Sequence, residues 1–413
     1  MSRSDASSAA RAFPSYDSDR RARTAALAGM IGLAVALGIG RFAFTPLLPL
    51  MLADGSIGLK AGSWLASANY AGYFVGAVSC AALRVAPARM VRFGLAATVL
   101  LTAAMGVGHL LPVWLAVRFV AGVVSAWTFV FVSQWGLRRL AELHAPEWSG
   151  VIYAGPGVGI VLTGLIGSAL AGQRAAWGWL GFAALSAVLS VAIWRTFGGA
   201  AAPGLPSSGG APRAPAAAAP AATPRHRADA MSLVVLYGMP GFGYIITATF
   251  LPVIARAALP AGSPWPDLFW PMFGAALIVG AIAAARLPAH WDNRLLLAGG
   301  CVTQALGIAA GIVWPNAAGF SLGSVLLGLP FTAITLFAMR EARRLHGEHA
   351  AGLMGYATAS YGVGQIAGPL VAAPLVAQSG SFTPVLWIAA ASLVAGAAGF
   401  AMRASRGRRW SPD

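Results

Sequence analysis

Two arginines interrupt long apolar stretches and are the residues of this sequence best able to do chemistry. Arg41 lies about 14 residues into the run 25–50, which is roughly 21 Å of helix. Arg118 lies about five residues into the run 113–136, roughly 8 Å of helix from its other end. The two guanidinium groups are therefore expected at a similar depth. Each presents a planar fork of N–H donors that suits a carboxylate or a phosphate.

Two interpretations of these arginines stay open. The apolar runs contain no interior Asp or Glu that would neutralise them. An ionisable group inside a membrane is costly and usually faces a water-filled cavity. A long side chain can instead extend to the membrane surface. Arg41 and Arg118 are thus predicted either to bind an anion together in a cavity or to reach the outer surface.

Polar and small residues share one face of the run 62–83. Asn69, Gly72, Tyr73 and Gly76 recur at helical spacing. Asn69 and Tyr73 are predicted to contribute to a binding site. The alternative is helix packing through the small residues Gly72 and Gly76.

A second polar face is predicted in the run 351–376. Thr358, Tyr361, Gln365 and Gly368 fall on one stripe. Tyr361 and Gln365 are predicted to line the same site, with hydrogen bonding between helices as the alternative. Tyr244, in the run 231–256, is predicted to stack on a ligand ring there, with ordinary packing as its alternative.

Two Gly-Pro pairs lie inside helical runs. They are Gly155-Pro156 and Gly368-Pro369. Proline removes a main-chain donor and bends a helix, and glycine admits a close neighbour. We expect these four residues to serve gating or packing.

No cluster of side chains with catalytic or metal-binding spacing can be found. An enzyme of this kind needs paired carboxylates, a nucleophile beside a base, or a metal centre. Cys80 and Cys301 fall in different runs, and the histidines fall at expected loops or helix ends and in a linker: His109, His144, His226, His290, His346 and His349. The chain is therefore predicted not to be an enzyme and to hold neither a metal nor a cofactor.

The elements that must position these residues are membrane-spanning helices. Of the 413 residues, 58% are hydrophobic and 10% are charged, and the mean hydropathy is +0.72. About 20 apolar residues cross a bilayer as a helix, and the runs lack the short alternating segments of a barrel. Twelve helices are predicted, at 25–50, 62–83, 90–109, 113–136, 148–170, 176–197, 231–256, 268–287, 295–314, 317–340, 351–376 and 383–402.

The distribution of arginine predicts the orientation. Basic residues gather before the first run, in alternate loops and after the last run, whereas the opposite loops hold only Lys60, Arg174 and Arg256. Lys and Arg in short loops stay on the cytoplasmic side, so both termini are expected there. The net charge of +16 then reflects topology and contact with anionic lipid, and no nucleic acid partner is expected.

A Pro-, Ala- and Gly-rich segment, 198–230, divides the runs six and six and is predicted to be a disordered cytoplasmic linker. The halves match in sequence, since Gly40 to Pro49 lies over Gly243 to Pro252 with a constant offset of 203 residues. Two parallel repeats are typical of one transporter architecture. The predicted organisation is a cytoplasmic tail 1–24, a six-helix half 25–197, the linker 198–230, a six-helix half 231–402 and a cytoplasmic tail 403–413.

Several strings resemble the major facilitator superfamily. Arg118-x-x-x-Gly122 and Gly155-Pro156 are similar to two of its motifs. The string from Gly38 to Met51, followed by the string from Ala68 to Ala77, resembles the signature of the YbfB/YjiJ family within it. The loop 83–89 departs from the superfamily because it lacks the acidic residue of the usual loop motif. We therefore do not infer for this loop the gating salt bridge of better-known members of the superfamily.

The resemblance implies an all-α membrane protein with the major facilitator fold and a secondary active transporter that works by alternating access. The expected partners are the lipid bilayer and a small organic solute, for which the arginines favour an organic anion. A drug or metabolite efflux antiporter and a transport-inactive sensor or scaffold are the alternatives. The expected location is a bacterial inner membrane, with the protein acting as a monomer.

Overall fold

The computed structural model describes residues 16–198, 224–288, 290–347 and 350–408, and every regular element in these ranges is a helix. The N-terminal half contains α1 (Tyr16–Leu33), a π-helix (Ala34–Ile39), α2 (Phe44–Ala53), α3 (Leu59–Ser79), α4 (Pro87–Val107), α5 (Leu111–Glu142), α6 (Ser149–Tyr153), α7 (Gly155–Ala169) and α8 (Ala175–Trp194). Short 3₁₀ turns follow α3, precede α6 and follow α8, at Cys80–Ala82, Pro146–Trp148 and Thr196–Gly198.

The C-terminal half has fewer interruptions. It contains α9 (Pro224–Ala258), α10 (Trp265–Arg286), α11 (Asn293–Val313), α12 (Ala317–Gly328), α13 (Phe331–His346), α14 (Ala351–Ser379) and α15 (Thr383–Arg408). Gly380 ends α14 with φ +68°, a left-handed conformation that glycine adopts without a steric penalty.

These helices form the twelve predicted spans. Within the described residues, eleven helical stretches are long and apolar enough to cross a membrane by length and composition. The twelfth span, α3, is not among them, and its sequence carries Ser, Asn and Tyr side chains. These polar side chains face the interior of the bundle at several positions, because Ser63, Ser67 and Asn69 are all buried.

Three spans are interrupted where proline or glycine disturbs the main-chain ladder. In the first span, α1 passes through the π-helix and a turn at 40–43 before α2 begins. Pro46 has no N–H, and the carbonyl of Phe42 accepts from Thr45 instead. The fifth span breaks at Ala154 between α6 and α7, and the tenth at Leu329–Pro330 between α12 and α13.

Several helices are longer than predicted. The first helix begins at Tyr16 rather than 25, and α9 begins at Pro224, so residues 224–230 of the predicted linker are helical. Proline is well tolerated in a first helical turn, and the Arg and Ala residues that follow favour helix. The last helix extends to Arg408, beyond the predicted 402. The rest of the predicted linker, 199–223, lies outside the described residues.

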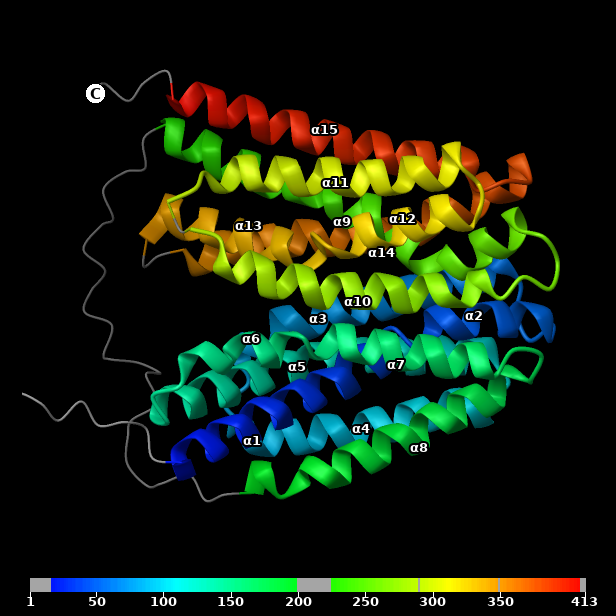
Figure 1. Ribbon diagram of the computed structural model, residues 1–413, viewed down its shortest axis with the longest axis horizontal. Helices are drawn as coiled ribbons and strands as arrows, with labels where there is room; N and C mark the ends of the chain where they lie inside the picture. The colour runs from blue at the N-terminus through cyan, green and yellow to red at the C-terminus, as the bar shows by residue number, and fades with distance from the viewer. Residues whose placement is uncertain (1–15, 199–223, 289, 348–349, 409–413) are drawn as a thin grey trace, which may run out of the picture.

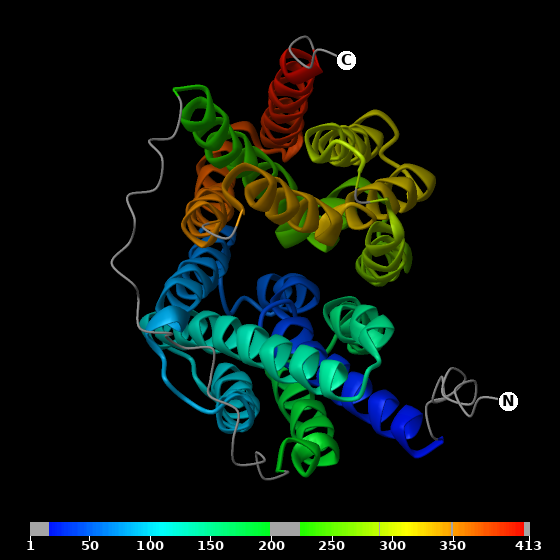
Figure 2. The same ribbon diagram turned by 90° about the vertical axis from the view of Figure 1, so that its left-hand side faces the viewer.

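The twelve spans form two bundles that lie one above the other in Figure 1 and are seen end-on in Figure 2. The bundles meet mainly along α2 with α9, α3 with α14, and α7 with α10. The Thr45 hydroxyl donates to the carbonyl of Ala248 at 3.1 Å across the first pair. These residues are equivalent in the sequence repeat, so they lie where an axis relating the two halves would pass.

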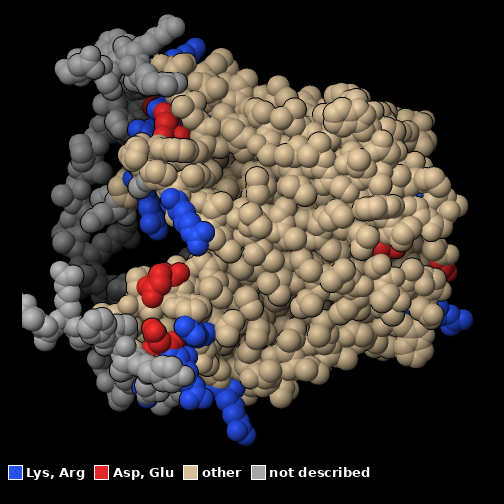
Figure 3. All heavy atoms as spheres, viewed as in Figure 1, with Lys and Arg blue, Asp and Glu red and all other residues tan. Residues whose placement is uncertain are grey.

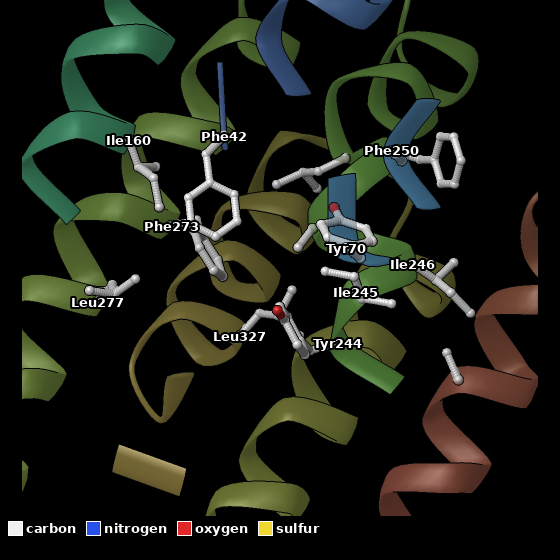
Figure 4. Close-up of a cluster of buried hydrophobic side chains, with 14 of the residues drawn as sticks. Phe42, Tyr70, Ile160, Tyr244, Ile245, Ile246, Phe250, Phe273, Leu277 and Leu327 are labelled. Atoms are coloured by element: carbon white, nitrogen blue, oxygen red, sulfur yellow. The ribbon is translucent and has the colours of Figure 1, made fainter. Parts of the chain in front are cut away.

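The largest hydrophobic core crosses the contact between the halves. Figure 4 shows Phe42, Tyr70 and Ile160 of the N-terminal half among residues of the C-terminal half such as Tyr244 and Phe273. A second core belongs to the N-terminal half alone and joins α1, α4, α5 and α6. The two halves therefore share buried side chains in the middle of the molecule.

Charged side chains gather at one end of the bundle, which we call the charged end (Figure 3). It carries the ion pairs Arg138–Glu142, Arg344–Glu341 and Arg403–Asp229. The first described residues of α1 and the last of α15 also lie there. The opposite end carries few charged residues, among them Asp54 and the pair Arg256–Asp267.

Candidate functional site

Arg41 lies at the centre of the contact between the halves, in the turn that follows the π-helix. Only 5% of its surface is exposed, so it does not extend to the outer surface. Its Nη2 donates to Oε1 of Gln365 on α14 at 3.0 Å, and its guanidinium carbon lies 4.0 Å from the centroid of the Tyr73 ring. One hydrogen bond and one cation–π contact thus connect this arginine to both halves.

Gln365 connects Arg41 to a group of tyrosines. Its Nε2 donates to the hydroxyl of Tyr244 on α9. The orientation of this amide follows from its partners, because an arginine can only donate and must face the amide oxygen. Tyr244, Arg41 and Gln365, three residues that the sequence predicted for one site, are brought together.

Tyr361 completes a stack of three rings between α9 and α14. Its ring centroid lies 5.8 Å from that of Tyr244, with an interplanar angle of 21°, and 4.8 Å from that of Tyr237, with an angle of 27°. The hydroxyl of Tyr237 donates to Oγ1 of Thr335 at 3.0 Å. Tyr244 thus packs in a group of tyrosine rings that also includes Tyr237, and its stacking on a ligand ring stays a prediction.

Arg118 lies behind Arg41, with 2% of its surface exposed. Its two Nη atoms donate to the main-chain carbonyls of Arg41, at 3.3 Å, and of Gly40, at 3.5 Å. Its guanidinium carbon is 4.9 Å from the ring centroid of Phe44. Extension to the outer surface does not apply here either, and the hydrogen bonds of this side chain hold the turn that carries Arg41.

The four residues of the predicted stripe on α3 have two different roles. Nδ2 of Asn69 donates to the carbonyl of Arg118 at 2.9 Å, and Tyr73 contacts Arg41. A Cβ atom on Gly72 or Gly76 would overlap the main chain of α5, so these two glycines serve the close packing of α3 on α5.

The Gly-Pro pairs lie at close helix contacts. A Cβ on Gly155 would overlap the carbonyl of Met30 in α1, and Pro156 stands in the first turn of α7. A Cβ on Gly368 would overlap the side chain of Ile245 in α9, and Pro369 lies inside α14. All four residues are positioned for packing, and their role in gating stays a prediction.

Some site residues were missed by the sequence interpretation. The Tyr70 hydroxyl and Oγ1 of Thr249 are 2.9 Å apart and join α3 to α9. Tyr70 precedes Tyr73 by three residues and Tyr237 precedes Tyr244 by seven, which are same-face spacings that could have identified both. Thr358, in contrast, is exposed and its hydroxyl donates to the carbonyl of Met354 in its own helix.

The two site arginines have no carboxylate partner among the described residues. The ion pairs found in these ranges lie at the two ends of the bundle. Buried Glu341, for example, accepts from Arg344 at 2.7 Å at the charged end. The Nε atoms of Arg41 and Arg118 are buried without a hydrogen-bond partner. The arrangement therefore has cationic donors in excess.

Asp54, at the opposite end, is held by hydrogen bonds from neighbouring residues. Its carboxylate accepts from the main-chain N–H of Ser56 at 3.0 Å and of Ala175, at the start of α8, at 2.9 Å. Burial raises its pKa, but these hydrogen bonds and that from the Ser56 hydroxyl outweigh burial and leave the pKa below its ordinary value. The Asp54 carboxylate therefore has hydrogen-bond donors of its own at the opposite end and does not pair with Arg41. In the described ranges, no three His, Cys, Asp or Glu residues are grouped closely enough to hold a metal ion.

Comparison with known proteins gives two findings. A family model described as an uncharacterised MFS-type transporter, YbfB, matches residues 33–400. The crystal structure of a mutant of the nucleoside transporter NupG is similar to this fold, with a TM-score of 0.67 and 15% sequence identity, and the match covers 92% of this chain and 99% of that chain. No curated protein matches the sequence.

Proposed function

The chain belongs to the MFS-type transporter family of YbfB, and from this premise we propose that it moves a small organic anion across a bacterial inner membrane. The proposed site contains Arg41, Tyr73, Tyr244, Tyr361 and Gln365. Arg118 holds the turn that carries Arg41, and Asn69 donates to the carbonyl of Arg118. The protein acts as a monomer and needs no cofactor.

The observation that carries this proposal is the excess of cationic donors around Arg41. A charged residue at the centre of a membrane costs about 2.5–3.5 kcal/mol on insertion scales, and it is retained where it has a function. The amide of Gln365 offers Arg41 one neutral acceptor oxygen. A carboxylate would offer two acceptor oxygens that share a negative charge. An anionic solute would therefore compensate the charge that the protein leaves unpaired.

The position of the site supports transport by alternating access. Arg41 and Gln365 belong to different halves, as do Tyr70 and Thr249. The surface is indented between the halves at the charged end (Figure 3). Rocking of one half against the other around this fixed site would expose it to each side in turn.

Both termini are proposed to be cytoplasmic, because the arginine-rich loops lie at the charged end together with the first described residues of α1 and the last of α15. Reporter fusions after Asp413 and within the linker at Ala217 should both show cytosolic behaviour: active β-galactosidase and inactive alkaline phosphatase. A fusion after Gly262, at the opposite end, serves as the periplasmic control. Active alkaline phosphatase at Asp413 in a full-length protein would reverse this orientation.

The proposed substrate class is tested by ligand-induced stabilisation of purified protein. The panel contains benzoate and succinate as organic anions, glucose as a neutral solute and tetraphenylphosphonium as a cation. A ligand that binds only the folded state, at 100 times its Kd, adds about 2.7 kcal/mol to the apparent stability. We expect at least one organic anion to raise the melting temperature of the wild type, and not that of Arg41→Met. Stabilisation by glucose or by the cation alone would contradict the proposal.

A further inference from the structure

The two arginines of the site do not offer equal binding capacity. Arg118 donates from both Nη atoms to the carbonyls of Gly40 and Arg41, and it is separated from α14 by the turn that carries Arg41. Arg41 donates from Nη2 to one side chain, that of Gln365, and the Nε atoms of both arginines are buried without a partner. Arg41 is therefore the guanidinium of the site whose Nη atoms are not both bonded to the main chain.

The groups around that guanidinium are neutral rings. Its carbon lies 4.0 Å from the ring centroid of Tyr73, 5.2 Å from that of Tyr70 and 5.3 Å from that of Phe42. A second negative group on a ligand would face these rings without a cation of its own. Burial of an unpaired charge is strongly unfavourable, so a dianion should be excluded.

Rings also lie on the side of Arg41 that faces the charged end. Helix α3 runs toward the charged end and α14 runs away from it. Tyr73 follows Tyr70 by about one turn, and Tyr361 precedes Gln365 by about one turn, so each lies nearer the charged end than that neighbouring contact of Arg41. Both side chains are partly exposed, as is Phe331, whereas Tyr70 and Tyr244 are buried. A ligand that approached from the charged end would meet aromatic faces and edges before its carboxylate reached Arg41.

From these observations we infer that the site takes a monocarboxylate whose body is a planar aromatic ring. This inference rests on the proposed function and narrows its substrate class. The carboxylate binds Arg41 in place of the Gln365 oxygen, and the ring packs against Tyr73 and Tyr361. Aromatic pairs prefer offset or edge-to-face contacts, which the partly exposed rings can provide.

The test compares five probes on the full-length protein in detergent by thermal shift and isothermal calorimetry. They are benzoate, cyclohexanecarboxylate with the same charge and no planar ring, benzamide with the ring and no charge, phthalate as an aromatic dianion, and inorganic phosphate. Benzoate should bind about two- to tenfold more tightly than cyclohexanecarboxylate, the range expected for one aromatic pair. Benzamide, phthalate and phosphate should bind at least tenfold more weakly than benzoate.

A variant pair separates the ring contact from general stability. Tyr73→Leu should lower the affinity for benzoate more than the affinity for cyclohexanecarboxylate, so that the preference between them narrows, with the contact to Tyr361 remaining. Tyr356→Leu is the matched control, because Tyr356 lies on α14 with 71% of its surface exposed. It should leave all affinities unchanged.

The outcomes distinguish this inference from the proposed function. Tighter binding of phthalate or phosphate than of benzoate would overturn the monocarboxylate, and equal binding of benzoate and cyclohexanecarboxylate would overturn the planar ring. In both cases the transport of an organic anion would stand. If none of the anions bound and only benzamide did, both would fail.

Discussion

Replacement of Arg41 by methionine is expected to abolish anion binding and transport without lowering the stability of the empty protein. The side chain is buried, has no carboxylate partner among the described residues, and donates to one side-chain amide that can rotate. An unpaired buried charge is costly to the folded state, so an apolar side chain of similar length in its place should not destabilise the protein. The loss of its bond to a carboxylate should cost about 2–5 kcal/mol in ligand affinity.

The measurements are the melting temperature of the empty protein, ligand affinity by calorimetry, and uptake of the best anion of the panel into proteoliposomes. Arg41→Lys should rescue binding poorly, because an ammonium group cannot reproduce a bidentate fork. Arg92→Met is a suitable control, since Arg92 contacts the ring and carbonyl of Trp194 away from the site. Wild-type affinity in Arg41→Met would place the anion site elsewhere.

The architecture was largely predictable because its causes are local. Continuous apolar runs required spanning helices, and Gly-Pro strings coincided with the break between α6 and α7 and with a close contact of α14. The repeat offset was informative for a different reason. Equivalent residues of two related halves meet where their axis passes, so the repeat alone could have paired Thr45 with Ala248.

Helix boundaries were less predictable because hydropathy marks the apolar segment and not the helix. Helix α5 continues to Glu142, six residues past the predicted end at 136. Arg138 and Glu142 pair at 3.0 Å with the i,i+4 spacing that stabilises an exposed helical turn. Such turns extend into water and leave no apolar signal.

The sequence predicted which of these residues come together, but not the contacts that connect them. The depth estimate placed Arg41 and Arg118 together, and the polar stripes included Gln365 and Tyr73. The main-chain acceptors of Arg118 depend on the π-helix and the turn after it, and no periodicity in the sequence reveals that turn. The sequence interpretation therefore gave both arginines the same direct role, which the two geometries now separate.

That separation yields the second large effect, in which Arg118→Met lowers the stability of the empty protein and also prevents ligand binding. Its two Nη atoms hold the carbonyls of Gly40 and Arg41 at an interruption of the helical ladder. A buried acceptor left without a donor costs about 1–3 kcal/mol. The melting temperature should therefore fall, and the turn that orients Arg41 should lose its register, so affinity for the best anion is lost indirectly.

The comparison with Arg41→Met makes this prediction decisive, because the two variants are expected to differ in the stability of the empty protein and to agree in the loss of binding. Arg139→Met, on the same helix and exposed beside Glu142, is the matched control and should change neither quantity. Arg118→Lys keeps the charge but offers no planar fork to two carbonyls, so it should recover only part of the stability. If Arg118→Met instead keeps the wild-type melting temperature and loses only binding, Arg118 contacts the anion directly, as the sequence alone had indicated.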